Sequence, residues 1–323
     1  MGKTSFCVIM SVILVTAVSL QSLWAADDNI LTDEEFFTLS DGTNLWELGG
    51  QEVRGLLVRR RGGGATFTET QEKQYCLLKK SSQVQWMLTD LDSGDTISRS
   101  SNAEQVFFGA SASKIFVAAA LLDKHEGMIT KNQLILISRM IVRSSNEAWK
   151  EVQRQVGQDG SDDSGRLSVQ AFSEKMGYKN LRPFQGWMTH PDGKRVHGNE
   201  LNSQAVARFL YDTYHNKYPG AEILWKIMHA TRTGSKKIDK YTPKSIYIAG
   251  KTGTYHGANE SKETVDLAVI MARNHAVVFS VNGKQYSLTI LCNTGKDEDV
   301  AVLGGGLMRE YLGVEKAVRC PDN

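Results

Sequence analysis

Hydrophobic and polar positions alternate early in the chain, then follow helical spacing over a long stretch, and alternate again near the end. The first alternating runs, residues 84–91 and 96–100, flank Asp92-Ser93-Gly94-Asp95, a composition typical of a tight turn. This pattern predicts a β-hairpin at the start of the main domain.

Helical spacing begins at Ser111 and continues, with interruptions, to about residue 230. Residues 115–122 are apolar almost all round, which predicts a helix buried inside the protein. Further helices are predicted at residues 131–142, 147–156, 169–176, 203–214 and 221–230, and a final helix at 300–312.

Strand patterning returns at residues 245–252, 264–272 and 285–292, with Asn282-Gly283 in the loop between the last two. Strands on both sides of a helical block predict an α+β fold in which a five-stranded antiparallel sheet is flanked by helices. We place this domain at residues 83–318, with an all-helical insertion at about 120–230. The Ser111 helix should lie between the sheet and the insertion.

The first residues resemble a secretory signal peptide. Lys3 precedes an apolar run from Phe6 to about Leu20, and small residues at Ala25 and Ala26 follow. We therefore assign residues 1–26 to a cleaved leader and expect an exported protein, periplasmic or secreted. The alternative is an uncleaved membrane anchor.

Residues 27–82 are polar and irregular, with short candidate strands at 55–58 and 74–78. We interpret them as an N-terminal extension to which the sequence assigns no role. The Arg59-Arg60-Arg61 triplet, followed by three glycines, is interpreted as a solvated turn, because no second basic cluster accompanies it.

Composition limits the classes of partner and cofactor. The formal charge of +2 among 323 residues is too small to predict nucleic acid or a membrane surface as the partner. Cys76, Cys292 and Cys320 remain after leader removal, enough for one disulfide and one thiol, and their spacing fits no metal site. No glycine-rich phosphate loop follows a strand, so we expect no cofactor and no metal.

Ser111 and Lys114 open the apolar helix directly after Gly109-Ala110. Residues three apart share a helix face, so Lys114 can reach the hydroxyl of Ser111 but not that of its neighbour Ser113. The positive potential at a helix N-terminus favours an alkoxide and a deprotonated amine. A neutral lysine is a competent base for a serine nucleophile. The alternative for this serine is a helix N-cap.

Two more polar motifs follow. Ser144 and Asn146 can both point into one cleft if their segment is a loop, with the hydroxyl as a proton relay and the carboxamide as a clamp. The alternative is a helix N-cap. Lys251-Thr252-Gly253 ends an apolar strand, and alternation places Lys251 and Gly253 on one face. A glycine there would let a substrate backbone lie against the strand.

Ser-x-x-Lys, Ser-x-Asn and Lys-Thr-Gly in this order resemble the motifs of the serine β-lactamase and penicillin-binding-protein superfamily. The resemblance covers about residues 84–312. Residues 107–110, 118–122 and Thr233-Gly234 are similar to class A β-lactamases more than to the other classes. The resemblance implies a β-lactamase/transpeptidase-like fold and a serine hydrolase that passes through an acyl-enzyme.

The resemblance also implies a catalytic role for four residues. Ser111 would be the acylated nucleophile and Lys114 its activator. Ser144 would shuttle the proton to the leaving nitrogen. The oxyanion hole would consist of the backbone N–H groups of Ser111 and Thr254.

Substrate binding is implied at the other motif positions. Asn146 would bind the substrate amide, and Lys251 and Thr252 would hold its carboxylate, with Gly253 beside them on the strand. The substrate would be a small β-lactam or a peptidoglycan stem peptide.

The sequence departs from class A enzymes in two ways. The interval from Ser111 to Ser144 is shorter by roughly a small helical subdomain, so part of the cleft wall is missing and the substrate preference is open. The loop expected to carry a glutamate for deacylation, within residues 180–202, has no acidic residue in the expected place. Glu200 is the leading candidate for the deacylation base, although a helix starts almost at once after it. Weaker candidates are Asp192, His190 and His197.

Three functions share this acylation machinery. The first is β-lactam hydrolysis by an acyl-serine enzyme. The second is a D-alanyl-D-alanine peptidase, or a related amidase or esterase. The third is a penicillin-binding or sensor domain that captures its ligand without turnover, an option that the missing glutamate leaves open.

Overall fold

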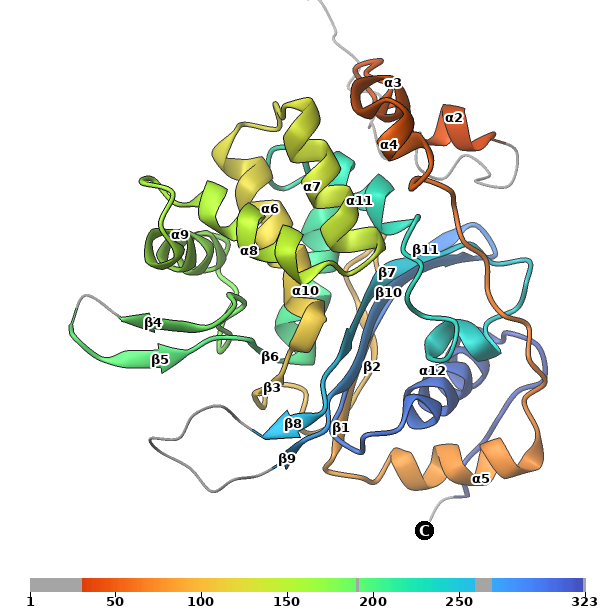
Figure 1. The fold of residues 1–323 in the computed structure, drawn as a ribbon. Helices are drawn as coiled ribbons and strands as arrows, with labels where there is room; N and C mark the ends of the chain where they lie inside the picture. The colour runs from red at the N-terminus through yellow and green to blue at the C-terminus, as the bar shows by residue number, and fades with distance from the viewer. Residues whose placement is uncertain (1–30, 190–191, 259–268, 322–323) are drawn as a thin grey trace, which may run out of the picture.

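A five-stranded antiparallel sheet organises the protein (Figure 1). The computed structural model describes residues 31–189, 192–258 and 269–321, so the expected leader lies outside the described residues. The strand order is β2-β1-β11-β10-β7, which confirms the predicted fold class and the position of the first hairpin beside the C-terminal strands. The sheet strands are β1 Val84–Asp90, β2 Thr96–Arg99, β7 Ile248–Thr254, β10 Arg273–Val281 and β11 Lys284–Cys292.

Helices cover both faces of this sheet. The helical insertion and the helix of the candidate nucleophile comprise α6 Lys114–Lys124, α7 Lys131–Val142, α8 Asn146–Val156, α9 Asp162–Lys175, α10 Ser203–Tyr214 and α11 Ala221–Met228. The remaining helices are α2 Asp33–Phe36, α3 Leu45–Gly49, α4 Gln51–Arg54, α5 Glu69–Leu78 and α12 Asp297–Leu312, with 3₁₀ turns η1 Ala110–Ser113 and η2 Ile238–Tyr241. Short strands pair as β3 Phe107–Phe108 with β6 Glu200–Leu201, β4 Trp187–Thr189 with β5 Arg195–His197, and β8 Gly257–Ala258 with β9 Val269–Ile270. None of the described helices is long and apolar enough to cross a membrane.

Strand alternation divides the interior into two hydrophobic cores. On β10, Ala276 and Val278 pack with the helical insertion, whereas Val277 and Phe279 pack with α12 and α5 on the opposite face. Helix α6 lies within the first core, and its residues from Lys114 to Leu122 are all buried. The apolar pattern at 115–122 therefore predicted its position correctly.

The strand predicted at residues 264–272 is not the one that joins the five-stranded sheet. Residues 264–268 lie outside the described part, and the sheet strand is β10, further along the chain. Asn282 and Gly283 both have positive φ, 52° and 75°, and they alone join β10 to β11. A two-residue turn of this kind requires the strands to begin and end directly beside it, so the preceding strand must end at Val281.

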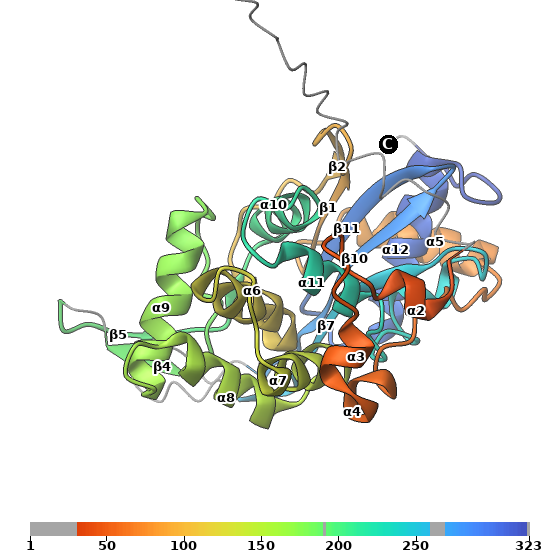
Figure 2. The ribbon, with the colours of Figure 1, turned by 90° about the horizontal axis from the view of Figure 1, so that it is seen from above.

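Residues 31–82 also differ from the prediction, since neither candidate strand at 55–58 or 74–78 exists. Residues 69–78 form helix α5, which starts at a capping box of Thr68 and Gln71. Its residues Tyr75 and Leu78 are buried. The Tyr75 ring packs against Gly306 of α12, where a side chain would leave no room for it. Helices α3 and α4 instead lie against α7, as Figures 1 and 2 show.

The Arg59-Arg60-Arg61 segment is not a solvated turn, which corrects that interpretation. It runs beside the start of the edge strand β7. Ile248 N donates to Arg60 O, and Gly62 N donates to Ile246 O. Arg59 is buried and pairs with Asp33 at 2.9 Å. Gly62 and Gly63 lie against backbone carbonyls of η2 and the residues after it, which leave little room for a side chain.

A disulfide between Cys76 and Cys320 joins α5 to the C-terminal segment, and Cys292 is a buried free thiol. The sequence allowed one disulfide but did not choose its partners. The bridge connects residues 244 positions apart, so it restricts the unfolded chain over most of its length.

We predict that the double variant Cys76→Ser/Cys320→Ser has a free energy of unfolding lower by about 2–5 kcal/mol, because a cross-link over a long loop lowers the entropy of the unfolded chain. Urea unfolding with and without reductant measures this. Reductant should destabilise the wild type and leave the double variant unchanged. An equal effect of reductant on both proteins would contradict the assignment.

Candidate active site

Ser111 lies on a tight turn that the surrounding backbone holds in place. It is the second residue of η1, half-buried, and α6 begins three residues later at Lys114. The preceding Ala110 has φ 48°, in the left-handed region that alanine rarely adopts. Such a conformation persists only where neighbouring structure fixes it, so the turn is built to present Ser111.

Gly253 and Asn274 supply that neighbouring structure. A side chain at Gly253 would lie 2.5 Å from Gly109 O, so this glycine lets β7 approach the serine turn. From the sequence, the glycine was expected to admit a substrate backbone instead. Asn274 is fully buried on β10 and donates to Phe108 O at 2.8 Å and Gly109 O at 2.9 Å. Sequence reasoning missed Asn274, because a lone asparagine in a strand carries no motif.

Lys114 is buried and faces the second motif. Its Nζ donates to Ser144 O at 2.6 Å, Asn146 Oδ1 at 2.8 Å and Ser144 Oγ at 3.3 Å. The ammonium also lies 5.0 Å from the ring centroid of Trp149. Burial lowers the pKa of Lys114 from 10.5 to about 7, so near neutral pH much of it is an uncharged amine.

The Ser144-Ser145-Asn146 segment combines the two interpretations offered for it. Ser145 is the N-cap of α8 and accepts from Ala148 N at 3.1 Å. Ser144 has φ 61°, which turns its hydroxyl away from the helix toward the lysines. The capping serine is therefore structural, and its neighbours on either side contact Lys114.

Lys251 completes the contact between the helical insertion and the sheet. Its Nζ donates to Ser144 Oγ at 2.9 Å and to Thr252 O at 2.9 Å, and its side chain is fully buried. Burial, with the nearby charges of Lys114 and then Lys237, lowers the pKa of Lys251 well below its usual value. Thr252 donates from Oγ1 to Thr233 Oγ1 at 2.6 Å.

Lys237 is a third buried cation that sequence reasoning missed. Its Nζ donates to Gly253 O at 3.3 Å and pairs with Asp297 at 2.8 Å. Asp297 also pairs with Arg273 at 3.5 Å, so one carboxylate serves two cations. Burial lowers the pKa of Lys237, and Asp297 opposes that effect. The signal was present in the sequence, three residues after Thr233-Gly234.

Asp239 and His275 lie behind this cation cluster. Arg60, from the segment before the glycines, pairs with Asp239, whose second oxygen is 3.8 Å from His275 Nε2. Burial raises the pKa of Asp239 to about 6, and burial lowers that of His275 well below its usual value. Besides burial, the charges of Lys237 and Lys251 contribute to the lowered pKa of His275, so these groups lie close to the cluster.

A cavity of about 270 Å³ opens beside Ser111. Its wall includes the aromatic rings of Phe108, Trp149 and Tyr255. No carboxylate is among the described residues that line it. The other lining residues are Ala110, Ser111, Asn146, Gln185, Gly186, His197, Asn199 and Thr254. Thr254 is exposed at the end of β7, next to the cavity.

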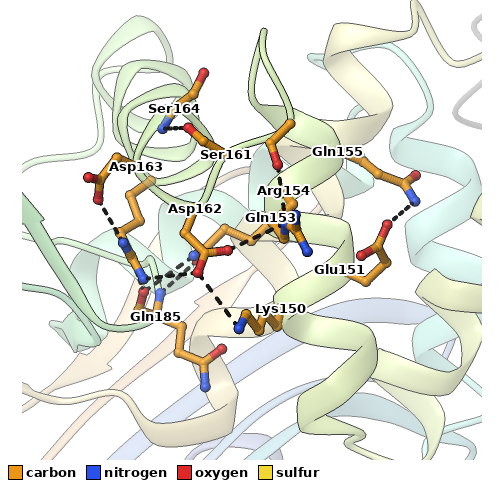
Figure 3. A network of polar contacts seen from close by, with 12 residues as sticks. Lys150, Glu151, Gln153, Arg154, Gln155, Ser161, Asp162, Asp163, Ser164 and Gln185 are labelled. Carbon is orange, nitrogen blue, oxygen red and sulfur yellow. Dashed lines mark hydrogen bonds and ion pairs between the residues drawn. The ribbon is translucent and has the colours of Figure 1, made fainter.

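Gln153 of α8 fixes the far wall of the cavity. Its side chain accepts from Gln185 N at 2.7 Å and donates to Gln185 O at 3.3 Å (Figure 3). Arg166 donates to the same carbonyl at 2.8 Å. Ion pairs from Asp162 to Lys150 and Arg154 join α9 to α8 around this clamp.

The candidates for a deacylation base differ in position. Glu200 pairs with Arg182 through its Oε2 and is not among the residues that line the cavity. Asp192 lies in the β4–β5 turn region near Lys194, at 3.8 Å, and is absent from the lining too. His190 lies outside the described residues. Among the three candidates that the structure describes, His197 lines the cavity.

No group of three or more His, Cys, Asp or Glu side chains in the described ranges is placed to hold a metal ion. The polar groups near Ser111 are instead hydroxyls, amides and buried amines. This donor set suits a ligand with carbonyl oxygens and a negative charge.

Several solved structures share the fold of this chain. A beta-lactamase from Streptosporangium roseum is 18% identical, covers 77% of this chain and 100% of its own, and gives a TM-score of 0.57. A beta lactamase from Xanthomonas campestris is 15% identical over 76% of this chain and 98% of its own, with a TM-score of 0.58. PBP-A is 16% identical, with 79% and 100% covered and a TM-score of 0.56.

Sequence comparison adds two findings. Beta-lactamase VEB-1 of Pseudomonas aeruginosa is 34% identical over 97 residues, which are 28% of this chain and 32% of VEB-1, so the match spans about a third of that relative. The model of the beta-lactamase enzyme family matches residues 133–304, more than half of the chain. The matched region includes Ser144, Asn146 and Lys251. The chain therefore belongs to the beta-lactamase enzyme family.

Proposed function

We propose that the protein is a serine hydrolase that opens β-lactam rings through an acyl-enzyme at Ser111. The observation that carries the proposal is the buried Lys114, with its pKa lowered to about 7 and its amine bound to Ser144 and Asn146. Family membership supports the substrate class.

Acylation begins with the proton of Ser111. Lys114 in its neutral form accepts that proton as Oγ attacks the lactam carbonyl carbon. The tetrahedral oxyanion is stabilised by the backbone N–H groups of Ser111 and Thr254, as in the expected oxyanion hole. Collapse breaks the carbon–nitrogen bond and leaves an ester on Ser111.

The leaving nitrogen takes its proton from Ser144. This hydroxyl lies within hydrogen-bond distance of both Lys114 and Lys251, so it can give up one proton and regain another from an ammonium. Asn146, whose Oδ1 is held by Lys114, offers its amide N–H₂ to the acyl-side carbonyl. Ser144 therefore protonates the nitrogen of the ring amide, whereas Asn146 binds the carbonyl of the acyl amide.

The carboxylate of the substrate suits the cation cluster. Lys251 and Lys237 are buried there, and within the described ranges Asp297 is the one carboxylate paired with Lys237, which leaves the cluster short of negative charge. Thr252, together with Thr233, adds hydroxyls next to Lys251. A carboxylate would supply the missing charge and accept these hydrogen bonds.

A second candidate, a penicillin-binding domain that releases its ligand very slowly, is favoured by the absence of a carboxylate from the described lining of the cavity. A D-alanyl-D-alanine peptidase would use the same acylation groups. These alternatives differ from the leading proposal in the rate of ester hydrolysis and in the leaving group.

We further propose export to the periplasm or the medium, on the apolar run after Lys3. The Cys76–Cys320 disulfide supports an oxidising compartment.

We predict that Ser111→Ala abolishes covalent labelling by a penicillin and that Ser113→Ala retains it. Ser113 is buried and donates to Asn199 Oδ1 at 2.7 Å, so its loss costs about 1 kcal/mol of stability but no nucleophile. Intact-mass spectrometry after incubation measures the adduct. An adduct on Ser111→Ala, or its equal loss from both variants, would show that the nucleophile is misplaced.

Turnover should show a burst. General-base assistance raises the rate of a step by about 10²–10⁴-fold. Because the described lining of the cavity lacks the usual carboxylate, the ester on Ser111 should form fast and be hydrolysed slowly. Rapid mixing with a chromogenic cephalosporin should give one equivalent of product quickly and a slow steady state. Fast turnover without a burst would contradict this prediction.

A further inference from the structure

Deacylation of an ester at Ser111, a step that rests on the proposed function, needs a group that can accept a proton from water. Lys114, proposed above as the base for acylation, is buried and donates to Ser144 O and Asn146 Oδ1. It does not line the cavity where a water would approach the ester. A second proton acceptor on the cavity wall would therefore serve this step.

His197 occupies that wall. It is partly buried at the end of β5 and lines the same cavity as Ser111 and Asn146. An imidazole ordinarily ionises near pH 6.5, so it can accept a proton at neutral pH. The other acyl-side lining groups in the described part are amides, aromatic rings and a threonine hydroxyl, which are poor bases.

Contacts on both sides fix the ring of His197. It stacks on Phe108, with ring centroids 6.3 Å apart, and meets the edge of Trp187 at 5.1 Å. Trp187 is also its partner across the β4–β5 pair. A base must be held in place to work, and these contacts supply that rigidity.

The backbone around His197 is anchored to the elements that carry the nucleophile. Gly198 N donates to Gly186 O at 2.9 Å, and the Gln153 clamp holds the neighbouring Gln185. On the other side, Gly109 N donates to Asn199 O at 2.7 Å. The serine turn and the β5 end therefore move as one unit.

Charged and titratable groups around His197 come from several elements. Arg195 on β5 lies 5.2 Å from the Trp187 ring centroid, and Arg166 on α9, paired with Asp163, approaches Gly186. Lys114 lies behind Trp149, and the Tyr255 ring meets Phe108 at 4.9 Å. Farther along the chain, the carboxylate of Glu200 on β6 is paired with Arg182.

We propose that His197 is the catalytic base of deacylation. Its neutral imidazole takes a proton from a water whose oxygen forms a bond to the ester carbonyl carbon. The tetrahedral intermediate then collapses, the bond from carbon to Ser111 Oγ breaks, and the imidazolium returns the proton to that oxygen. The products are a carboxylic acid and free Ser111, with no other reactant.

The test measures acylation and deacylation separately in His197→Gln. Penicillin labelling, followed by intact mass, should proceed at the wild-type rate, while the loss of the adduct slows by about 10²-fold or more. In the wild type the deacylation rate should rise with pH across the neutral range as the base loses its proton, and then level off. The variant should lose that dependence.

His125→Gln is the matched control, since His125 caps the far end of α6 and contacts Gln133 at 3.0 Å. It should deacylate as the wild type does. In His197→Ala, added imidazole should restore part of the deacylation rate, which a purely structural role of His197 would not allow. An unchanged pH profile in His197→Gln, or no rescue in His197→Ala, would overturn the proposal. Absence of any adduct on the wild type would instead refute the proposed function itself.

Discussion

One hydroxyl oxygen between two buried amines is the contact on which the candidate site depends. Ser144 Oγ accepts from Lys114 at 3.3 Å and from Lys251 at 2.9 Å. The charge of Lys114 disfavours a charge on Lys251, so both amines cannot cheaply stay protonated. Burial adds to that cost for each lysine. An uncharged Lys114 amine near neutral pH follows from its burial in this arrangement.

The rest of the fold brings these groups together from distant parts of the chain. Lys114 comes from helix α6 within the first core, Ser144 from the loop before α8, and Lys251 from the edge strand β7. Gly253 allows β7 to lie against the serine turn, and Asn274 ties that turn to β10. Residues before the first hairpin take part as well, because Arg60 pairs with Asp239 behind the cations.

Much of this could be predicted from local pattern. Helices α7 and α10 have the predicted ends, because amphipathic spacing and side-chain caps at Thr130 and Asn202 define them locally. The serine, lysine and asparagine motifs are short and keep their spacing. The position of strand β10 was predicted wrongly because it depends on pairing with β11 through a two-residue turn. The hydrophobic pattern of a short segment does not contain this pairing.

Other features could not be predicted because they depend on contacts between distant residues. Arg60 looked solvated until Asp239 lay beside it, and Lys237 carried no motif of its own. Glu200 was the leading candidate for the deacylation base by sequence, yet its carboxylate is paired with Arg182. His197 and Asn199 reach the cavity only because β6 pairs with β3 ahead of the serine turn.

The ionisation of Lys114 is the central claim, and it can be measured directly. Isotope labelling of the lysine side chains, with Lys114→Arg to assign the signal, would allow its Cε and Nζ resonances to be followed by NMR as pH changes. The account predicts a midpoint near 7 for Lys114 in the folded protein without substrate. A midpoint near the ordinary lysine value of about 10.4 would contradict it, because the amine would then be charged and unable to act as the base for Ser111.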